Sequence, residues 1–196
     1  NGTSTGQGGG GFGAWTIIPA DFGLGLFVTD ANTIQFQVSN GSQGPTGLRV
    51  EACVEVPLPV TRPYNVSTGF DEAAGKTLAD DALDASYTLT GPGIGPVAST
   101  AVAEDGFPIP PWLINSVNAR WIGVAAADSI GPAGDYTFKT QVTLPAGLEV
   151  GRAILSGSMT ADDAVVDVVV NGTSTGIVAS DSTKLSPFPV DAGQGL

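Results

Sequence analysis

Hydrophobic and polar residues alternate along several short stretches of this chain, the pattern of β-strands with one buried face. The predicted inner face of residues 33–39 carries Ile34, Phe36 and Val38. Residues 47–56 repeat the alternation after a turn that begins at Asn40-Gly41. The two stretches are therefore predicted to form an antiparallel hairpin.

Further stretches with strand character lie at both sides of this pair. They are residues 14–20, 85–90, 97–103, 119–126, 135–144, 152–159 and 164–171. One face of 135–144 is predicted to carry Tyr136, Phe138, Thr140, Val142 and Leu144. Because no stretch has a convincing helical period, the chain is predicted to be all-β, a jelly-roll-type β-sandwich.

Proline and acidic residues divide the chain. Three prolines in residues 57–63 remove donors that a central strand needs, so 57–64 is interpreted as a linker. It separates residues 1–56 from a main sandwich at 65–170, in which 66–84 reads as a long acidic loop and 161–163 as a turn.

The two ends of the chain are copies of one segment. Residues 1–6 and 171–176 both read Asn-Gly-Thr-Ser-Thr-Gly, and residues 1–26 match 171–196 at 11 of 26 positions without a gap. Composition alone would give about two or three matches. The offset of 170 residues predicts a repeating unit, which residues 171–196 re-enter.

Charge and hydropathy limit the partners. Seven Lys and Arg against 19 Asp and Glu give a net charge of −12, which argues against binding to nucleic acid or to anionic membrane surfaces. No apolar run reaches the ~18 residues that span a bilayer. A first residue other than Met predicts a mature or trimmed product.

Catalytic chemistry has little basis in the composition. The chain has no His, which excludes Ser-His-Asp and Cys-His nucleophiles and His-bound zinc. The carboxylate pairs Glu104/Asp105 and Asp162/Asp163 are adjacent in sequence and are expected to diverge, so no enzyme is predicted. The single Cys53 lies on the polar face of 47–56, as a partly buried thiol or as one half of an inter-chain disulfide.

Acidic turns are the candidate metal sites. Asp162 and Asp163 precede the 164–171 strand, whereas Asp81 and Asp84 lie in the 66–84 loop with Asp71 and Asp80. Carboxylates and carbonyls of such turns can bind calcium, although neither set has an EF-hand pattern. The alternative is that these carboxylates are solvated turn residues. Calcium is the only cofactor that the sequence suggests.

Three tryptophans admit two interpretations. Trp15, Trp112 and Trp121 could form a platform on which sugars stack, or they could pack in the core or between domains. Trp112 follows prolines and Trp121 lies in an apolar strand, which favours packing.

Four motifs occur in a fixed order in the second half of the chain. They are Arg-Trp-Ile-Gly at 120–123, Ala-Gly-Asp-Tyr-Thr-Phe at 133–138, Leu-Ser-Gly-Ser-Met-Thr-Ala-Asp at 155–162 and Val-Asn-Gly-Thr-Ser-Thr-Gly at 170–176. The set resembles a β-sandwich module of secreted bacterial proteins, many of which end in a PEP-CTERM-type sorting tail. The resemblance implies secretion and a galactose-binding-like or jelly-roll sandwich.

In that family the last motif precedes a pair of closing strands. Here the matching residues, 30–40 and 47–50, lie at the N-terminal end. The resemblance thus implies a sandwich whose closing strands, within 1–56, come from the same chain or from a neighbouring copy.

These observations predict a structural protein. Head-to-tail docking of duplicated ends forms filaments, and tandem linkage in a longer chain gives the same geometry. We expect a secreted, cell-surface subunit or repeat of a filament or biofilm matrix, with neighbouring copies as partners. A carbohydrate-binding or adhesive module that binds glycans is the alternative. The residues predicted to serve assembly are Asn1, Gly6, Ile34, Phe36, Val38, Asn171 and Gly176.

Overall fold

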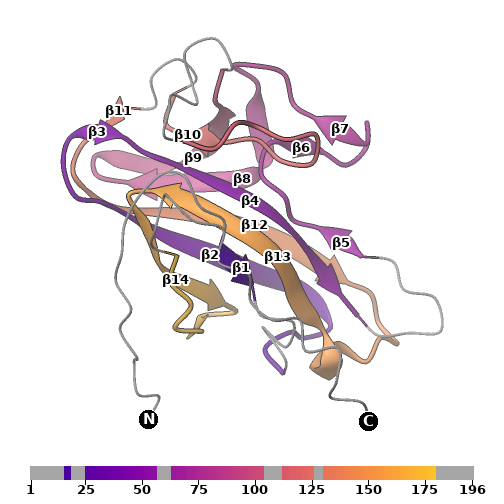
Figure 1. Cartoon of the computed structure of the whole chain (residues 1–196). Helices are drawn as coiled ribbons and strands as arrows, with labels where there is room; N and C mark the ends of the chain where they lie inside the picture. Colours follow the sequence, from indigo (N-terminus) through magenta and orange to yellow (C-terminus); the bar gives the residue numbers. More distant parts are fainter. Residues whose placement is uncertain (1–15, 19–24, 57–62, 104–111, 126–129, 180–196) are drawn as a thin grey trace.

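The computed structural model describes residues 16–18, 25–56, 63–103, 112–125 and 130–179 (Figure 1). These residues form β-strands and one short 3-10 helix, η1 (Val150–Arg152), and the described part of the chain contains no α-helix. The prediction of an all-β fold is confirmed.

The strands follow one another along the chain with short connections. They are β1 (Thr16–Ile18), β2 (Asp30–Asn40), β3 (Gly44–Pro45), β4 (Gly47–Glu55), β5 (Tyr64–Asn65), β6 (Phe70–Asp71), β7 (Lys76–Thr77), β8 (Leu83–Gly91), β9 (Ile94–Ala101), β10 (Ile122–Gly123), β11 (Ile130–Gly131), β12 (Gly134–Leu144), β13 (Ile154–Asp162), β14 (Ala164–Val170) and β15 (Thr173–Ser174).

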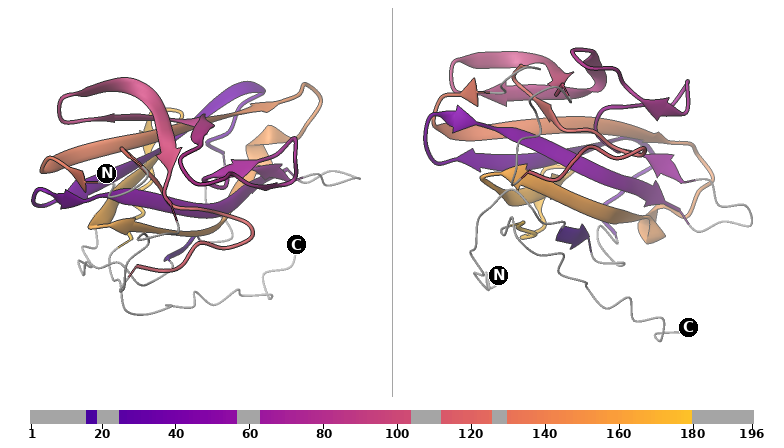
Figure 2. Two further views of the ribbon diagram at one scale, coloured as in Figure 1. Left: turned by 90° about the horizontal axis from the view of Figure 1, so that it is seen from above. Right: turned by 45° about the horizontal axis from the view of Figure 1, so that its top comes forward.

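Most strands belong to one antiparallel sheet with the order β1-β13-β4-β10-β9-β8-β12-β2-β14-β15. The sheet folds over, so that β4 and β13 lie in front of β2 and β12 in Figure 1, and the two layers are seen from other sides in Figure 2. The short β10 joins the layers, because Ile122 pairs with Ala101 of β9 and with Leu48 of β4.

The core lies between the layers and is built by alternate residues. The fully buried side chains that face it from β2, β4 and β12 include Ile34, Phe36, Val38, Val50, Val54, Tyr136, Phe138 and Leu144. These are faces that the alternation predicted, since burial of one face of a strand selects apolar residues at every second position.

Strand β2 lies inside the sheet rather than at its edge. It pairs with β12 over eleven residues, from Gly134↔Asn40 to Leu144↔Asp30, and with β14 on its other side. Residues of the N-terminal quarter therefore complete the same sheet as β8, β12 and β14, within a single chain.

The predicted hairpin between 33–39 and 47–56 is wrong. Strand β2 pairs with β12 and β14, whereas β4 pairs with β13, β10 and β5. The chain between them crosses from one layer to the other through β3, which pairs with β11. Alternation gives the buried face of each strand but cannot tell a neighbour in the sheet from a partner across the core.

Other boundaries also differ from the sequence prediction. The strand expected at 119–126 is reduced to Ile122–Gly123, and the expected loop at 66–84 contains the β6–β7 pair. Strand β13 continues through Asp162, where a turn was expected. Of the predicted linker, 57–62 lies outside the described residues, whereas Tyr64 belongs to β5.

Two tryptophans form a second small cluster with Val102. Trp112 and Trp121 are 5% and 0% exposed, and their rings stack with centroids 4.3 Å apart. Core packing is therefore confirmed for these two residues, and the sugar-platform interpretation is wrong for them because neither ring faces solvent. Trp15 lies outside the described residues.

Candidate assembly site

A tight hairpin begins the second motif copy, residues 171–196. Val170 pairs with Thr173, so that Asn171 and Gly172 form a two-residue turn with φ values of 49° and 81°. Such turns need positive φ at both central positions, for which Asn-Gly is the favoured sequence. The Asn-Gly that opens the motif thus explains the turn.

The Asn171 side chain joins three backbone segments. Its Oδ1 accepts a hydrogen bond from the Thr33 N–H at 2.8 Å. Its Nδ2 donates to the carbonyl of Leu26 and to Oδ1 of Asn32, each at 2.8 Å. The first residue of the second motif copy therefore contacts Leu26, the last residue of the first motif copy.

The second motif copy continues along the edge of β14. The Thr175 N–H donates to the carbonyl of Val168 at 3.0 Å, and Thr173–Ser174 form β15 on β14. Ala179 and Val165 exchange two backbone hydrogen bonds of 2.9 and 3.1 Å. Gly176, with φ +68°, donates its N–H to Asp167 Oδ1 at 3.2 Å. Residues 171–179 thus cover one end of the sheet.

Residues 16–18 of the first motif copy, residues 1–26, lie at the other end of the sheet. Its strand β1 pairs with β13 in the register Thr16↔Met159, Ile17↔Ser158 and Ile18↔Gly157. Further along, the Gly25 N–H donates to the carbonyl of Gly151 at 3.1 Å. Different thirds of one repeated motif therefore attach to β13 and to β14, which follow each other in the chain.

The predicted assembly residues divide between several places. Asn171 and Gly176 lie in the turn and on the edge just described, whereas Asn1 and Gly6 lie outside the described residues. Ile34, Phe36 and Val38 are 0% exposed in the core. They face the core as members of the predicted closing strands and offer no surface to a neighbour in this conformation.

Asp162, a calcium candidate, is buried at the end of β13. It is 2% exposed and accepts a 3.1 Å hydrogen bond from Trp112 Nε1. Burial, with Asp163 next to it, raises the pKa of this carboxyl to about 8. Asp163 itself accepts the Gly41 N–H at 2.8 Å. The pair joins loops by hydrogen bonds, and a protonated Asp162 is a poor calcium ligand.

The other two calcium candidates lie apart from this pair. Asp84 is 1% exposed, accepts the Gly69 N–H at 2.7 Å and the Ser86 N–H at 2.9 Å, and has a pKa raised by burial. Asp81 is exposed, in a left-handed conformation with φ 63°. Across the described ranges, no three His, Cys, Asp or Glu residues are grouped to hold a metal ion.

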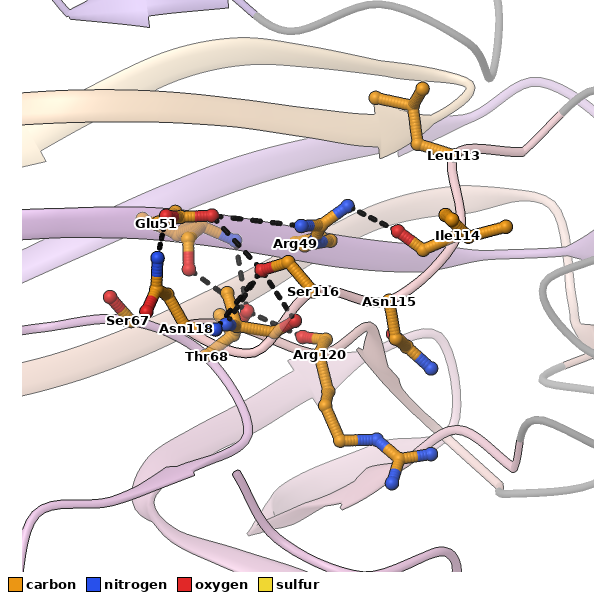
Figure 3. A network of polar contacts seen from close by, with 12 residues as sticks. Arg49, Glu51, Ser67, Thr68, Leu113, Ile114, Asn115, Ser116, Asn118 and Arg120 are labelled. Atoms are coloured by element: carbon orange, nitrogen blue, oxygen red, sulfur yellow. Dashed lines mark hydrogen bonds and ion pairs between the residues drawn. The ribbon is translucent and has the colours of Figure 1, made fainter. Parts of the chain in front are cut away.

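A polar network around the buried Arg49 holds the loop after Trp112 on the outer face of β4 (Figure 3). Arg49, 2% exposed, donates through Nη1 to the carbonyl of Ile114 at 2.5 Å and lies 3.6 Å from Glu51. Glu51 accepts hydrogen bonds from Ser116 Oγ at 3.1 Å and from Asn118 Nδ2 at 2.6 Å. Burial lowers the pKa of Arg49 to about 10, although Glu51 opposes this shift.

Sequence reasoning missed this network. Its only sequence signal was an arginine and a glutamate two positions apart on one strand, Arg49 and Glu51. The partners Ile114, Ser116 and Asn118 lie about 65 residues further along the chain, in a stretch to which the sequence pattern assigned no element.

A groove of about 400 Å³ lies next to this network. Its lining includes Glu51, Cys53, Asn65, Phe70, Asn118 and Ser156. The Cys53 Sγ lies 3.5 Å from Ser156 Oγ and from Glu55 Oε1, and burial raises the pKa of the thiol. The prediction of a partly buried thiol on the polar face of β4 is confirmed.

Comparisons with known proteins give no relative. No protein family, curated protein or solved structure matches this chain. The resemblance to modules of PEP-CTERM proteins therefore depends on the sequence motifs alone. Within the described ranges, no helix has the length and apolar character needed to cross a membrane.

Proposed function

We propose that this protein is a structural subunit or repeat of an extracellular filament or surface fibre, joined to neighbouring copies of itself. One observation carries the proposal: two copies of a 26-residue motif attach to different strands of one sandwich. The second copy attaches to β14 through its first nine residues, and the first copy attaches to β13 through residues 16–18.

The first motif copy consequently carries a sequence for each end of the sheet, because residues 1–6 repeat the start of the segment that attaches to β14 and residues 16–18 form β1. Between two sandwiches, its first residues can pair with β14 of the preceding sandwich and its later residues with β13 of the following one. A long tandem chain and a head-to-tail row of separate subunits both provide this arrangement. The shared motif then acts as a joint.

The electrostatics and the resemblance support a structural role outside the cell. A net charge of −12 keeps an exposed β-protein soluble, and the motifs resemble those of secreted modules. We assign no catalytic role, because the buried carboxylates have structural partners: Asp162 is bonded to Trp112 and Asp84 to the Gly69 backbone.

Electron microscopy of the purified chain and of a variant without residues 1–18 tests the proposal. The intact chain is expected to form filaments, and the shortened chain is expected to stay soluble, because it lacks β1 but keeps Leu26 and the rest of the fold. Gly75→Ala, in the β6–β7 turn away from both ends of the sheet, is the matched control and should still assemble. Failure of the folded, intact chain to form filaments would refute the proposal, whereas unchanged filaments without residues 1–18 would show that these residues do not form the joint.

The groove favours one second candidate, an adhesive module that binds carbohydrate. The Phe70 ring and the amides of Asn65 and Asn118 line it, and aromatic faces with amides suit a neutral sugar ring. Binding on a glycan array that is lost in Phe70→Ala and Asn118→Ala, but kept in Gly75→Ala, would support this function. A flat array from the folded wild-type protein would count against it.

A further inference from the structure

We infer that β1 is an exchangeable strand, and that the edge of β13 between Gly157 and Met159 accepts residues 16–18 of a neighbouring chain. The inference rests on the proposed function and adds to it the donor, the acceptor and the register. The expected contact repeats the pairs Thr16↔Met159, Ile17↔Ser158 and Ile18↔Gly157 between two chains.

The two ends of the sheet differ in how firmly their outer strands are held. β15 follows β14 after the two-residue turn at Asn171 and Gly172, and Ala179 is bonded to Val165 further along. A local hairpin of this kind closes a very short loop, so if it opens it forms again within about 1–10 μs.

β1 is held by much less. It forms three pairs with β13, and its partners lie about 140 residues away in the chain. Gly25, seven positions after Ile18, is bonded to Gly151, so these three pairs can open without disturbing the rest of the fold, whereas residues 171–179 are held by a hairpin and a further bridge. The β13 edge is therefore the end of the sheet whose outer strand is the easier to replace.

Exchange between chains loses no contact at this edge. Residues 16–18 of a neighbour have the same sequence as the strand they replace, so every pair with β13 can form again, as in domain swapping. The exchange also keeps the edge covered, which matters because an open edge leaves backbone donors and acceptors unpaired.

The first motif copy is the better donor for this edge. At the corresponding positions the second copy has Ser-Pro-Phe, residues 186–188, which lie outside the described residues. Pro187 would stand where Ile17 faces Ser158, and proline has no N–H to donate to a strand ladder. The Thr-Ile-Ile of the first copy keeps every donor.

Gly157 lets the acceptor strand lie close to its inner neighbour, β4. A Cβ at this position would lie 2.2 Å from the carbonyl oxygen of Glu51 and 2.5 Å from Ala52. The β13 backbone therefore lies directly against β4, and Ile18 pairs with the glycine itself. A donor strand therefore meets an edge that is backed by nine pairs between β13 and β4.

Disulfide trapping tests the exchange. In a Cys53→Ser background, one chain carries Ile17→Cys and another carries Ser158→Cys, and the two are mixed, assembled and oxidised. Directly paired residues of antiparallel strands have Cα atoms about 4.5–5.5 Å apart, within the range that a disulfide spans. We expect a dimer band of twice the chain's mass on a denaturing gel of the mixture, and none from either chain alone.

A second pair of variants is the control. Gln35 and Lys139 are paired inside the sheet, in β2 and β12. A mixture of Gln35→Cys and Lys139→Cys chains should give no dimer, because β2 stays within its own chain. Dimers from this pair would mean that a larger N-terminal segment is exchanged, and would overturn the assignment to β1.

The outcomes separate this inference from the proposed function. One outcome is that filaments form in the Cys53→Ser background while no dimer linked through positions 17 and 158 (a 17–158 dimer) is found. That result overturns the exchange of β1 and leaves the filament proposal standing. A 17–158 dimer without a 35–139 dimer supports the exchange. If no preparation forms filaments, the proposed function fails, whereas a specific 17–158 dimer would still support strand exchange between chains.

Discussion

Asn171 and Leu26 lie 145 positions apart in the sequence and are joined by a 2.8 Å hydrogen bond from Asn171 Nδ2 to the Leu26 carbonyl. One residue opens the second motif copy and the other closes the first. The chain therefore enters and leaves the sandwich, residues 27–170, at the same place.

Replacement of Asn171 tests the strength of this closure. Asn171→Ala removes the bonds to Thr33, Leu26 and Asn32 and places a residue with a Cβ but no polar group at φ 49°. We expect the free energy of unfolding, measured by urea titration, to fall by about 1–2 kcal/mol. Asn171→Gly relieves the backbone conformation but not the lost bonds, so a Gly variant as stable as the wild type would contradict the role of the side chain.

Gly157→Ala tests the close approach of β13 and β4. The added methyl would lie 2.2 Å from the carbonyl oxygen of Glu51, at a residue with φ +148°. Gly75, with φ +64° and nothing within 4 Å of the added methyl, is the control for backbone strain alone. We expect Gly75→Ala to lower the free energy of unfolding by about 1 kcal/mol. Gly157→Ala should lower it by at least about 2 kcal/mol more. Equal melting temperatures for the two variants would show that β13 can move away from β4.

The faces of the long strands could be predicted from the sequence because burial acts on every second residue. The alternation at Tyr136 and Phe138, and at Ile34 and Phe36, matches side chains that the structure buries completely. The turn at Asn171 and Gly172 was not predicted, because the strand expected at 164–171 included Asn171, although Asn-Gly is the local signal for such a turn.

Pairing partners and long-range polar contacts could not be predicted in the same way. Strands β2 and β4 have similar alternation, yet they lie in different layers. Asp162 looked like a solvated turn residue, because nothing near it in the sequence reveals that Trp112 covers it. Arg49 donates to the carbonyl of Ile114, a contact with a backbone group that no side-chain pattern encodes.

Calcium removal gives a direct test of the acidic turns. We expect the melting temperature to be the same with calcium and with a chelator, because Asp162 is bonded to Trp112 and Asp84 to two backbone N–H groups. Thermal unfolding followed by circular dichroism in both buffers is sufficient. A rise in melting temperature on adding calcium would instead support the calcium prediction, and its loss in Asp163→Asn or in Asp81→Asn would show which turn binds the ion.

The buried Asp162 predicts an unusual dependence of stability on pH. Its pKa is about 8 in the folded protein, against about 3.9 for an Asp in an unfolded chain. Between these values the folded protein holds a proton that the unfolded chain has released, so the free energy of unfolding falls as pH rises from about 4 to about 8.

Asp162→Asn tests this assignment, because the variant side chain cannot ionise and still offers an oxygen to Trp112 Nε1. Urea titrations from about pH 4 to about pH 8 should show that the free energy of unfolding falls less steeply with pH in the variant than in the wild type. The variant then becomes the more stable protein at the alkaline end. Asp84, whose pKa burial also raises, remains in both proteins and leaves a residual slope of the same sign. Parallel profiles for the two proteins would contradict the assignment to Asp162.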